Sequence, residues 1–254
     1  MKFLEEALDQ YNLRARFFPA FLMILPPALG VVAVFPLNYQ EPVGIVAGIA
    51  GMVLIWYLAD LVRECGQNAQ ARLYQQWGGK PSILLLSHFQ SVIAVDTLLR
   101  CHNKLRELDP NLKIPHTPEE EQNNPTRATA VYQSCNELLL ERTRDKSKFG
   151  LLFEENIRFG ARRNIYGIRW LGFASAIIGF VMSLGAAIAR ACRTGEPDAV
   201  SVAGSVASGL LVIFWLLLVR SRWVRRQANE YGVRLILSCQ NLEVKESKPA
   251  KEGG

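Results

Sequence analysis

Four apolar stretches without a charged residue constrain this chain more than any other feature. They form two closely spaced pairs, residues 17–36 with 43–59 and residues 171–189 with 200–219. Each is about long enough to cross a hydrocarbon core of roughly 30 Å, because an α-helix rises about 1.5 Å per residue. The pattern therefore predicts an integral membrane protein with four transmembrane helices, arranged as two hairpins.

The positions of the basic residues predict which side of the membrane each region occupies. Of 29 lysine and arginine residues, only Arg190 and Arg193 lie in a connector expected outside, and the first connector, residues 37–42, has none. The other 27 lie in the N-terminal segment, the middle region and the tail. Because cationic flanks stay on the cytoplasmic side during insertion, we expect these three regions, and both termini, in the cytoplasm.

The predicted fold class is all-α, with a helical cytoplasmic domain inserted between the two hairpins. The regions are a cytoplasmic segment (1–16), hairpin 1 (17–59), the cytoplasmic domain (60–170), hairpin 2 (171–219) and a cytoplasmic tail (220–254), expected to be disordered from about residue 243. The tail beyond that point is rich in Lys, Glu, Gly and Pro and has little to bury.

Helical patterns dominate the middle region. The second span is expected to continue as a helix to Trp77, where Gly78-Gly79 ends it. Further helices are expected over residues 91–108, 124–144, 149–166 and 227–242. The four apolar residues 83–86 fit a strand or a buried turn equally well. Thr117-Pro118 predicts the start of one short helix, because Thr is a good N-cap and Pro suits the first helical position.

Prolines and small residues mark helix faces that either pack against other helices or line an aqueous path. Pro26-Pro27 predicts a kink or a local break, because proline lacks an amide donor, and the freed carbonyls should face the bundle interior. Such a point is a static kink or a hinge for gating. Small residues recur at the spacing that lets helices approach closely: Gly44 and Gly48, Ser175 and Gly179, and Ser201, Ser205 and Ser208. The three serines share one stripe, which suits helix packing or a narrow aqueous path.

Arginines flank the third span on its cytoplasmic side. Arg142 and Arg144 precede the last helix of the middle domain, and Arg162 and Arg163 lie next to the membrane. Basic groups in this position bind anionic lipid headgroups. The alternative is a pocket in which these four residues hold a phosphorylated ligand, because guanidinium groups match phosphate oxygens.

No catalytic or metal-binding motif is visible. Gly79-Lys80-Pro81-Ser82 departs from a P-loop, because Pro81 stands where Ser or Thr should follow the lysine. The cysteines and histidines show no metal-ligand spacing; they are Cys65, Cys101, Cys135, Cys192 and Cys239, and His88, His102 and His116. We expect no enzyme activity, cofactor or metal. The membrane explains the net charge of +6, so no nucleic-acid partner is expected.

As a whole the chain resembles uncharacterised bacterial inner-membrane proteins. The resemblance depends on residues 11–16 (Tyr-Asn-Leu-Arg-Ala-Arg) before a proline-rich span, and on Thr143-Arg144-Asp145 and residues 153–156 (Phe-Glu-Glu-Asn) before the third. It implies a multi-pass protein of the inner membrane and brings no functional site with it.

Two classes of function fit this layout. The first is a non-enzymatic membrane assembly component or effector: the cytoplasmic domain senses a partner or an anionic ligand, and the spans associate in a homo-oligomer or membrane protein complex, as in some antiphage defence systems. The second is a small channel or transporter with its path near Pro26, Pro27 and the serine stripe. The absence of ionisable residues deep in any span argues against ion-coupled transport. The expected partners are the lipid bilayer and its anionic headgroups.

Overall fold

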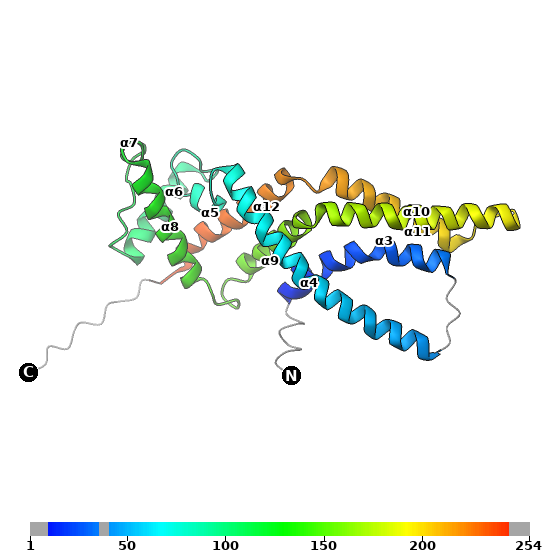
Figure 1. The fold of residues 1–254 in the computed structure, drawn as a ribbon. Helices are drawn as coiled ribbons and strands as arrows, with labels where there is room; N and C mark the ends of the chain where they lie inside the picture. Colours follow the sequence, from blue (N-terminus) through cyan, green and yellow to red (C-terminus); the bar gives the residue numbers. More distant parts are fainter. Residues whose placement is uncertain (1–9, 36–40, 244–254) are drawn as a thin grey trace, which may run out of the picture. The chain divides into compact units, whose positions relative to one another are not determined.

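The computed structural model of the chain describes residues 10–35 and 41–243, without the side chains of residues 41–47, 49 and 50. Every regular element in these ranges is helical, and they contain no strand (Figure 1). The all-α class is therefore confirmed for the described residues. The expected disorder beyond residue 243 lies outside them.

The chain forms two compact units, and each is described by itself. Unit 1 contains Met1–Leu73 and Ile157–Arg225, and unit 2 contains Tyr74–Asn156 and Arg226–Gly254. The boundaries fall within three helices: α4 (Glu41–Trp77), α9 (Gly150–Gly167) and α12 (Ser221–Leu237). Unit 2 is thus shorter at both ends than the expected domain 60–170, because the adjoining parts of α4 and α9 pack in unit 1.

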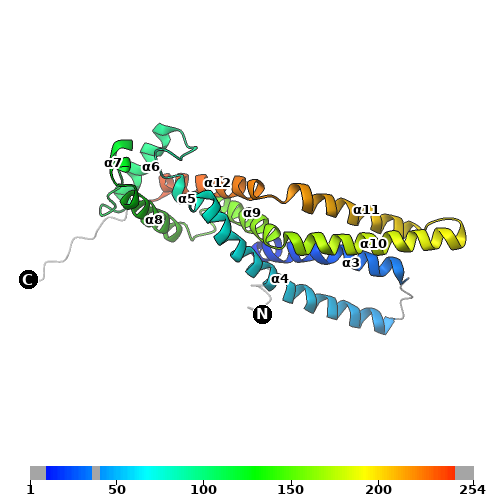
Figure 2. The ribbon, with the colours of Figure 1, turned by 45° about the horizontal axis from the view of Figure 1, so that its top comes forward.

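Unit 1 is a bundle in which α10 contacts both α3 and α11 (Figures 1 and 2). Besides parts of α4, α9 and α12, its elements are α2 (Gln10–Asn12), the π-helical turn η1 (Leu13–Phe17), α3 (Phe18–Val34), α10 (Arg169–Thr194), α11 (Ala199–Ile213) and the π-helical turn η2 (Phe214–Leu218). Trp215 is fully buried in this bundle and fits against Gly172, where any side chain would overlap the indole ring.

Three described segments are long and apolar enough to cross a membrane. They are Gln10–Val34, Arg169–Thr194 and Ala199–Leu218, and they correspond to the first, third and fourth predicted spans. The second predicted span, residues 43–59, includes side chains outside the described part. Many apolar side chains on these segments face outward, among them Val181 and Leu210, which are 60% and 62% exposed. Large exposed apolar surfaces are typical of contact with lipid or with other proteins.

The helix α3 passes through Pro26 and Pro27 without a break. Of the two expected alternatives, a kink or a local break, the break was therefore wrong: the fixed φ of proline, about −65°, is itself a helical value. Pro26 is buried and its carbonyl group lies against Gly179 of α10, while a Cβ at Gly30 would lie 2.9 Å from the Cβ of Met182. Small residues thus let α3 and α10 approach closely.

A second close crossing in unit 1 joins α4 and α9. A Cβ at Gly167 would lie 2.5 Å from the backbone carbon of Cys65, so only glycine fits there. Beside it, Asn164 is fully buried and donates from Nδ2 to the Ala15 carbonyl oxygen at 2.6 Å. The beginning of the apolar segment Gln10–Val34 is thereby fixed to α9.

Unit 2 contains short helices in addition to its parts of α4, α9 and α12. They are α5 (Pro81–Leu84), α6 (Val95–Leu108), α7 (Pro118–Asn123), α8 (Pro125–Arg142) and the 3-10 turn η3 (Ser238–Asn241). The α4 helix ends where Gly78 and Gly79 adopt φ values of +82° and +147°, as expected from the glycine pair. Residues 83–86 are a helical turn and not a strand.

Caps and an apolar core hold unit 2 together. The Thr117 and Asn124 side chains accept hydrogen bonds from the backbone amides of Glu120 and Arg127, which starts α7 and α8 as the sequence predicts. The core contains residues from α6 and α8 and from the chain after residue 226. Residues assigned to a tail by sequence, including Leu235, therefore belong to this unit.

Candidate functional site

Unit 2 contains a cavity of about 600 Å³ whose charged lining is mainly basic. Its cations are Arg106, Lys113 and Arg127; His116 also lines it, and Glu120 is the one carboxylate among its lining residues. We call this the cationic cavity. Its excess of positive charge favours an anionic occupant, because guanidinium and ammonium groups form strong charge-assisted hydrogen bonds with phosphate and carboxylate oxygens.

Three separate parts of the chain place these cations. Arg106 lies in the last turn of α6, Lys113 and His116 lie in the loop between α6 and α7, and Arg127 lies in the first turn of α8. The loop stays out of helical conformation because prolines at positions 110 and 115 interrupt any helix there, and Pro118 then begins α7. No local sequence motif brings the cations together, which is why the sequence alone did not reveal this site.

Arg106 forms hydrogen bonds with the loop that lines the cationic cavity. Its Nη2 donates to the carbonyl oxygens of Ile114 and Pro115, both at 3.1 Å, and its Nη1 donates to Asn103 Oδ1 at 2.7 Å. Its Nε is buried and has no hydrogen-bond partner among the described residues. Buried donors without a partner are uncommon and are often satisfied by water or a bound ligand.

A buried polar network joins α7 to the turn after α5 and to α8. The Glu121 carboxylate accepts hydrogen bonds from the Ser87 hydroxyl group, from the His88 amide at 2.9 Å and from the Tyr132 hydroxyl group at 2.9 Å. Burial and the nearby carboxylate raise the pKa of Tyr132, so that it stays a neutral donor. Glu121 follows Glu120 directly, and the network therefore fixes the helix that carries the cavity's carboxylate.

His102 completes this network as a neutral side chain. It is fully buried, its Nε2 lies 2.9 Å from the Leu86 carbonyl oxygen, and its ring stacks on Tyr132 with centroids 5.9 Å apart. Burial lowers the pKa of His102 to about 4. It is therefore uncharged near pH 7, with Nε2 as the donor, and it does not add to the charge of the cationic cavity.

The arginines predicted to share a phosphate site are divided between the two units. Arg142 and Arg144 belong to unit 2, where Arg144 pairs with Glu141 at 2.5 Å. Arg162 and Arg163 belong to unit 1.

Both unit 1 arginines have partners of their own. Arg162 Nη1 donates to the Trp223 carbonyl oxygen at 3.3 Å and its guanidinium group lies over the Trp223 ring, while Arg163 Nη1 donates to Gln70 Oε1 at 2.7 Å. These contacts join neighbouring helices within unit 1. Neither unit taken alone brings the four arginines together.

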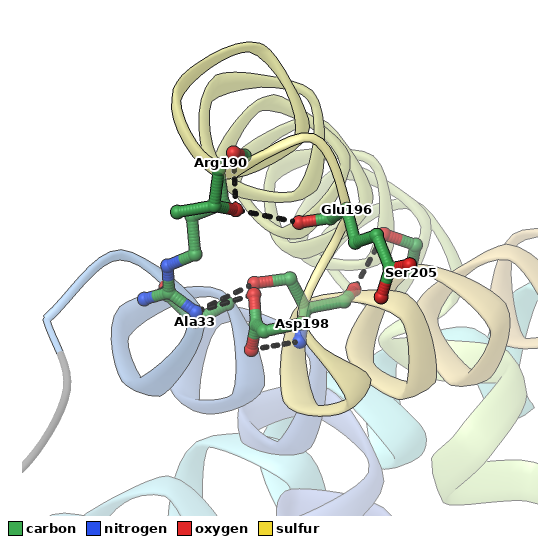
Figure 3. Close-up of polar contacts among 7 residues, drawn as sticks. Ala33, Arg190, Glu196, Asp198 and Ser205 are labelled. Carbon is green, nitrogen blue, oxygen red and sulfur yellow. Dashed lines mark hydrogen bonds and ion pairs between the residues drawn. The ribbon is translucent and has the colours of Figure 1, made fainter.

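The predicted serine stripe is buried between helices of the same chain. Ser201 and Ser208 are fully buried, and Ser205 donates to the Ser201 carbonyl oxygen at 2.8 Å (Figure 3). A Cβ at the neighbouring Gly204 would lie 2.8 Å from Ser183 Oγ of α10, so α11 and α10 are in close contact here. In this arrangement the stripe forms a helix contact.

The glycine pair predicted in the second span differs from the serines. A Cβ at Gly48 would meet no atom within 4 Å, so this position of α4 is open. Gly44 lies outside the residues whose side chains the structure describes.

A polar cluster at the end of the bundle joins three helices (Figure 3). Arg190 of α10 donates from Nη2 to the Ala33 carbonyl oxygen of α3 at 2.6 Å, and its Nη1 forms an ion pair with Asp198. Asp198 is the N-cap of α11 and accepts a hydrogen bond from the Ser201 amide at 3.1 Å. The sequence placed Arg190 in an outside connector and did not predict this contact.

The cationic cavity has both the volume and the charge for a small anionic ligand. Side chains of Leu112, Ile114 and Pro115 give it apolar walls between the basic groups, a combination that is usual in ligand sites. In the described residues, no group of three or more His, Cys, Asp or Glu side chains is placed to hold a metal ion. No protein-family model, curated protein or solved structure matches this chain.

Proposed function

We propose that this chain is a multi-pass membrane protein whose cytoplasmic unit 2 binds a small phosphorylated ligand, and whose spans act as a non-enzymatic effector or assembly component. The observation that supports the ligand is the cationic cavity, with three cations, one histidine and one carboxylate around about 600 Å³. Such a volume accommodates a drug-sized molecule.

The proposal includes four spans, with unit 2 and both termini in the cytoplasm of a bacterial cell. The fourth span is residues 43–59, which carry no charge. Its described part supports lipid contact, because Met52, Val53 and Tyr57 are between 62% and 66% exposed. Exposed Trp56 and Trp170 are candidates for the membrane boundary, where indole rings are enriched.

Association of the spans with further copies is the second part of the proposal. The face of α4 that carries Gly48 and Gly51 has open space where a Cβ would stand. Small residues on a helix allow close approach of a second helix in lipid. We infer that ligand binding in unit 2 alters this association, which is what distinguishes an effector from a static scaffold.

Ligand binding can be tested with the full-length protein in lipid nanodiscs, with pyrophosphate as the probe and calorimetry as the measurement. A Lys113→Ala/Arg127→Ala variant should bind pyrophosphate at least tenfold more weakly, because a hydrogen bond to a charged group contributes about 1.5–3 kcal/mol. Arg100→Ala is the matched control: this exposed arginine of α6 bonds Thr97 and does not line the cavity.

The outcome separates specific binding from general attraction to a basic protein. The proposal requires that wild type and Arg100→Ala bind alike and that the double variant does not. Equal binding by all three proteins, or no binding by wild type at physiological ionic strength, would contradict it. Arg106 is unsuitable for this test, because its guanidinium group also holds the loop.

A further inference from the structure

Unit 2 contains another cavity, of about 230 Å³, which carries a negative charge. It lies between α5, the turn after α5, α7 and α8, and its polar lining is Ser87, Gln90, Glu121, Gln122, Thr129 and Tyr132. Among the described residues that line it, Glu121 is the one charged side chain. We call this the acidic pocket. None of its described lining residues also lines the cationic cavity, so the two are separate places in unit 2.

The carboxylate of the acidic pocket is buried without a cation beside it. Glu121 is only 8% exposed, and its donors are the Ser87 and Tyr132 hydroxyl groups and the His88 backbone amide, all of them neutral. Within residues 10–35 and 41–243, it forms no ion pair with a lysine, arginine or histidine. Buried carboxylates are normally paired with a cation, because burial removes the water that stabilises their charge. The charge of Glu121 is therefore left for a cation from outside the chain.

The acidic pocket also offers hydrogen-bond acceptors to such a cation. Glu121 Oε2 accepts two hydrogen bonds, whereas Oε1 accepts one, from Ser87, and so has a free lone pair. Thr129 donates its own proton to a carbonyl oxygen in the preceding turn of α8, at 2.9 Å, which leaves its hydroxyl oxygen as an acceptor. Gln90 and Gln122 add side-chain carbonyl oxygens. An ammonium group has three donors and no acceptor, so it matches this set.

The remaining walls and the volume define the body of the ligand. Ile83, Leu84 and Phe89 line the acidic pocket with apolar surface, which suits an alkyl chain. The Phe89 ring is 53% exposed, and a cation beside an aromatic ring is attracted to its face. A volume of about 230 Å³ is below the roughly 300–1,000 Å³ of sites for drug-sized molecules, so the chain must be short. Phosphates and carboxylates are disfavoured, because they carry the same charge as Glu121.

We propose that the acidic pocket binds a short primary alkylamine, whose ammonium group pairs with Glu121 and whose alkyl chain lies against Ile83, Leu84 and Phe89. The ligand supplies the buried carboxylate with the counter-charge that the described chain does not. This goes beyond the phosphorylated ligand of the cationic cavity and does not depend on it. Glu120 and Glu121, successive residues of α7, line the two different cavities, so unit 2 has separate sites for an anion and for a cation.

The test titrates the full-length protein, in nanodiscs of zwitterionic lipid at pH 7, with butylamine and with 1-butanol, and follows binding by saturation-transfer NMR. Wild type should bind butylamine at least about tenfold more tightly than 1-butanol, because a hydrogen bond to a charged group is stronger than one to a neutral group. Glu121→Gln should lose this preference and still bind 1-butanol, since the amide keeps the shape without the charge. Glu119→Gln, the same change at an exposed position of α7 outside the pocket, is the matched control and should keep it.

Two further variants keep the test decisive if Glu121→Gln does not fold, as judged by thermal unfolding. Phe89→Ala removes an exposed ring and should weaken butylamine binding about two- to fivefold. Val92→Ala, also exposed in the segment after α5 but outside the pocket lining, should bind butylamine like wild type. Equal affinity of wild type for butylamine and 1-butanol, or butylamine binding that is unchanged in both Glu121→Gln and Phe89→Ala, would overturn the proposal.

Discussion

Gly179 of α10 lies directly against the carbonyl group of Pro26 in α3, so that even a methyl group at position 179 would overlap it. One turn further along α3, a Cβ at Gly30 would approach the Gly179 Cα to 3.3 Å. The close contact occurs where the two prolines remove backbone donors from α3. The proline pair and the small residues of α10 thus act together as one packing surface.

The first prediction follows from this contact. Gly179→Ala should destabilise the protein by about 1–3 kcal/mol, because overpacking forces the two helices apart. Gly185→Ala on the same helix is the matched control, since a Cβ there meets nothing within 4 Å. The measurement is the midpoint of thermal unfolding in detergent. Equal midpoints for the two variants would show that α3 and α10 are not in close contact at this point.

The second prediction concerns the ion pair between Arg190 and Asp198. Asp198→Ala removes both the ion pair and the N-cap of α11, whereas Asp198→Asn retains a capping side chain. Thermal unfolding should therefore rank wild type above Asp198→Asn and Asp198→Asn above Asp198→Ala. Glu196→Gln, a change of the same charge in the same connector, should match wild type. A Glu196→Gln variant as unstable as Asp198→Asn would mean that overall charge, and not this contact, matters.

The ion pair also predicts a pH dependence. Hydrogen bonds from Ser201 and Arg190 hold the pKa of Asp198 at about 2, below its ordinary value of 3.8. The stabilisation is therefore present above about pH 4 and is lost as the pH falls through about 2. Acid unfolding of wild type should show this loss and Asp198→Asn should lack it. Identical acid profiles would exclude a charged Asp198 in the folded state.

Some features of the fold could be predicted from the sequence because they depend only on residues that are adjacent in the sequence. Thr117 and Asn124 cap the helices that they precede, and Gly78-Gly79 ends α4, since capping and positive φ are local properties. The three long apolar segments Gln10–Val34, Arg169–Thr194 and Ala199–Leu218 were visible because each contains a long run without charge. The boundaries of α6, α8 and α9 lie within four residues of the expected ones, whereas α12 begins six residues before the expected residue 227.

Other features depend on contacts between distant residues. Arg106 and Arg127 line one cavity because a proline-rich loop folds back between their helices, and no spacing in the sequence indicates this. The limits of unit 2 differ from the expected 60–170 because α4 and α9 are continuous helices, and each has residues in both units. The boundary falls inside these helices, so the polarity of the sequence does not mark it.

The third prediction uses the buried His102. Its pKa of about 4 in the folded protein is below the ordinary 6.5, so the unfolded chain binds a proton that the folded chain excludes. Stability is therefore greatest above about pH 6.5 and falls, by at most about 3 kcal/mol, as the pH decreases toward 4. Hydrogen exchange of α6 and α8 in the full-length protein should accelerate over this interval. His102→Gln should flatten the response, while His116→Gln, at an exposed position, should leave it unchanged.

The last prediction tests the proposed orientation of the chain in the membrane. Cys192 is exposed near the end of α10, in the region that the positive-inside rule places outside the cytoplasm. A membrane-impermeant maleimide should label Cys192 in intact cells once the outer membrane is made permeable. In a Cys192→Ser background, Gln122→Cys should be labelled only after the inner membrane is lysed, because α7 belongs to unit 2. Labelling of Gln122→Cys in intact cells would place unit 2 outside and would contradict the proposed binding of a cytoplasmic ligand. Labelling of both positions only after lysis would instead mean that α10 does not cross the bilayer, because α10 is the long apolar helix between the two positions in the chain.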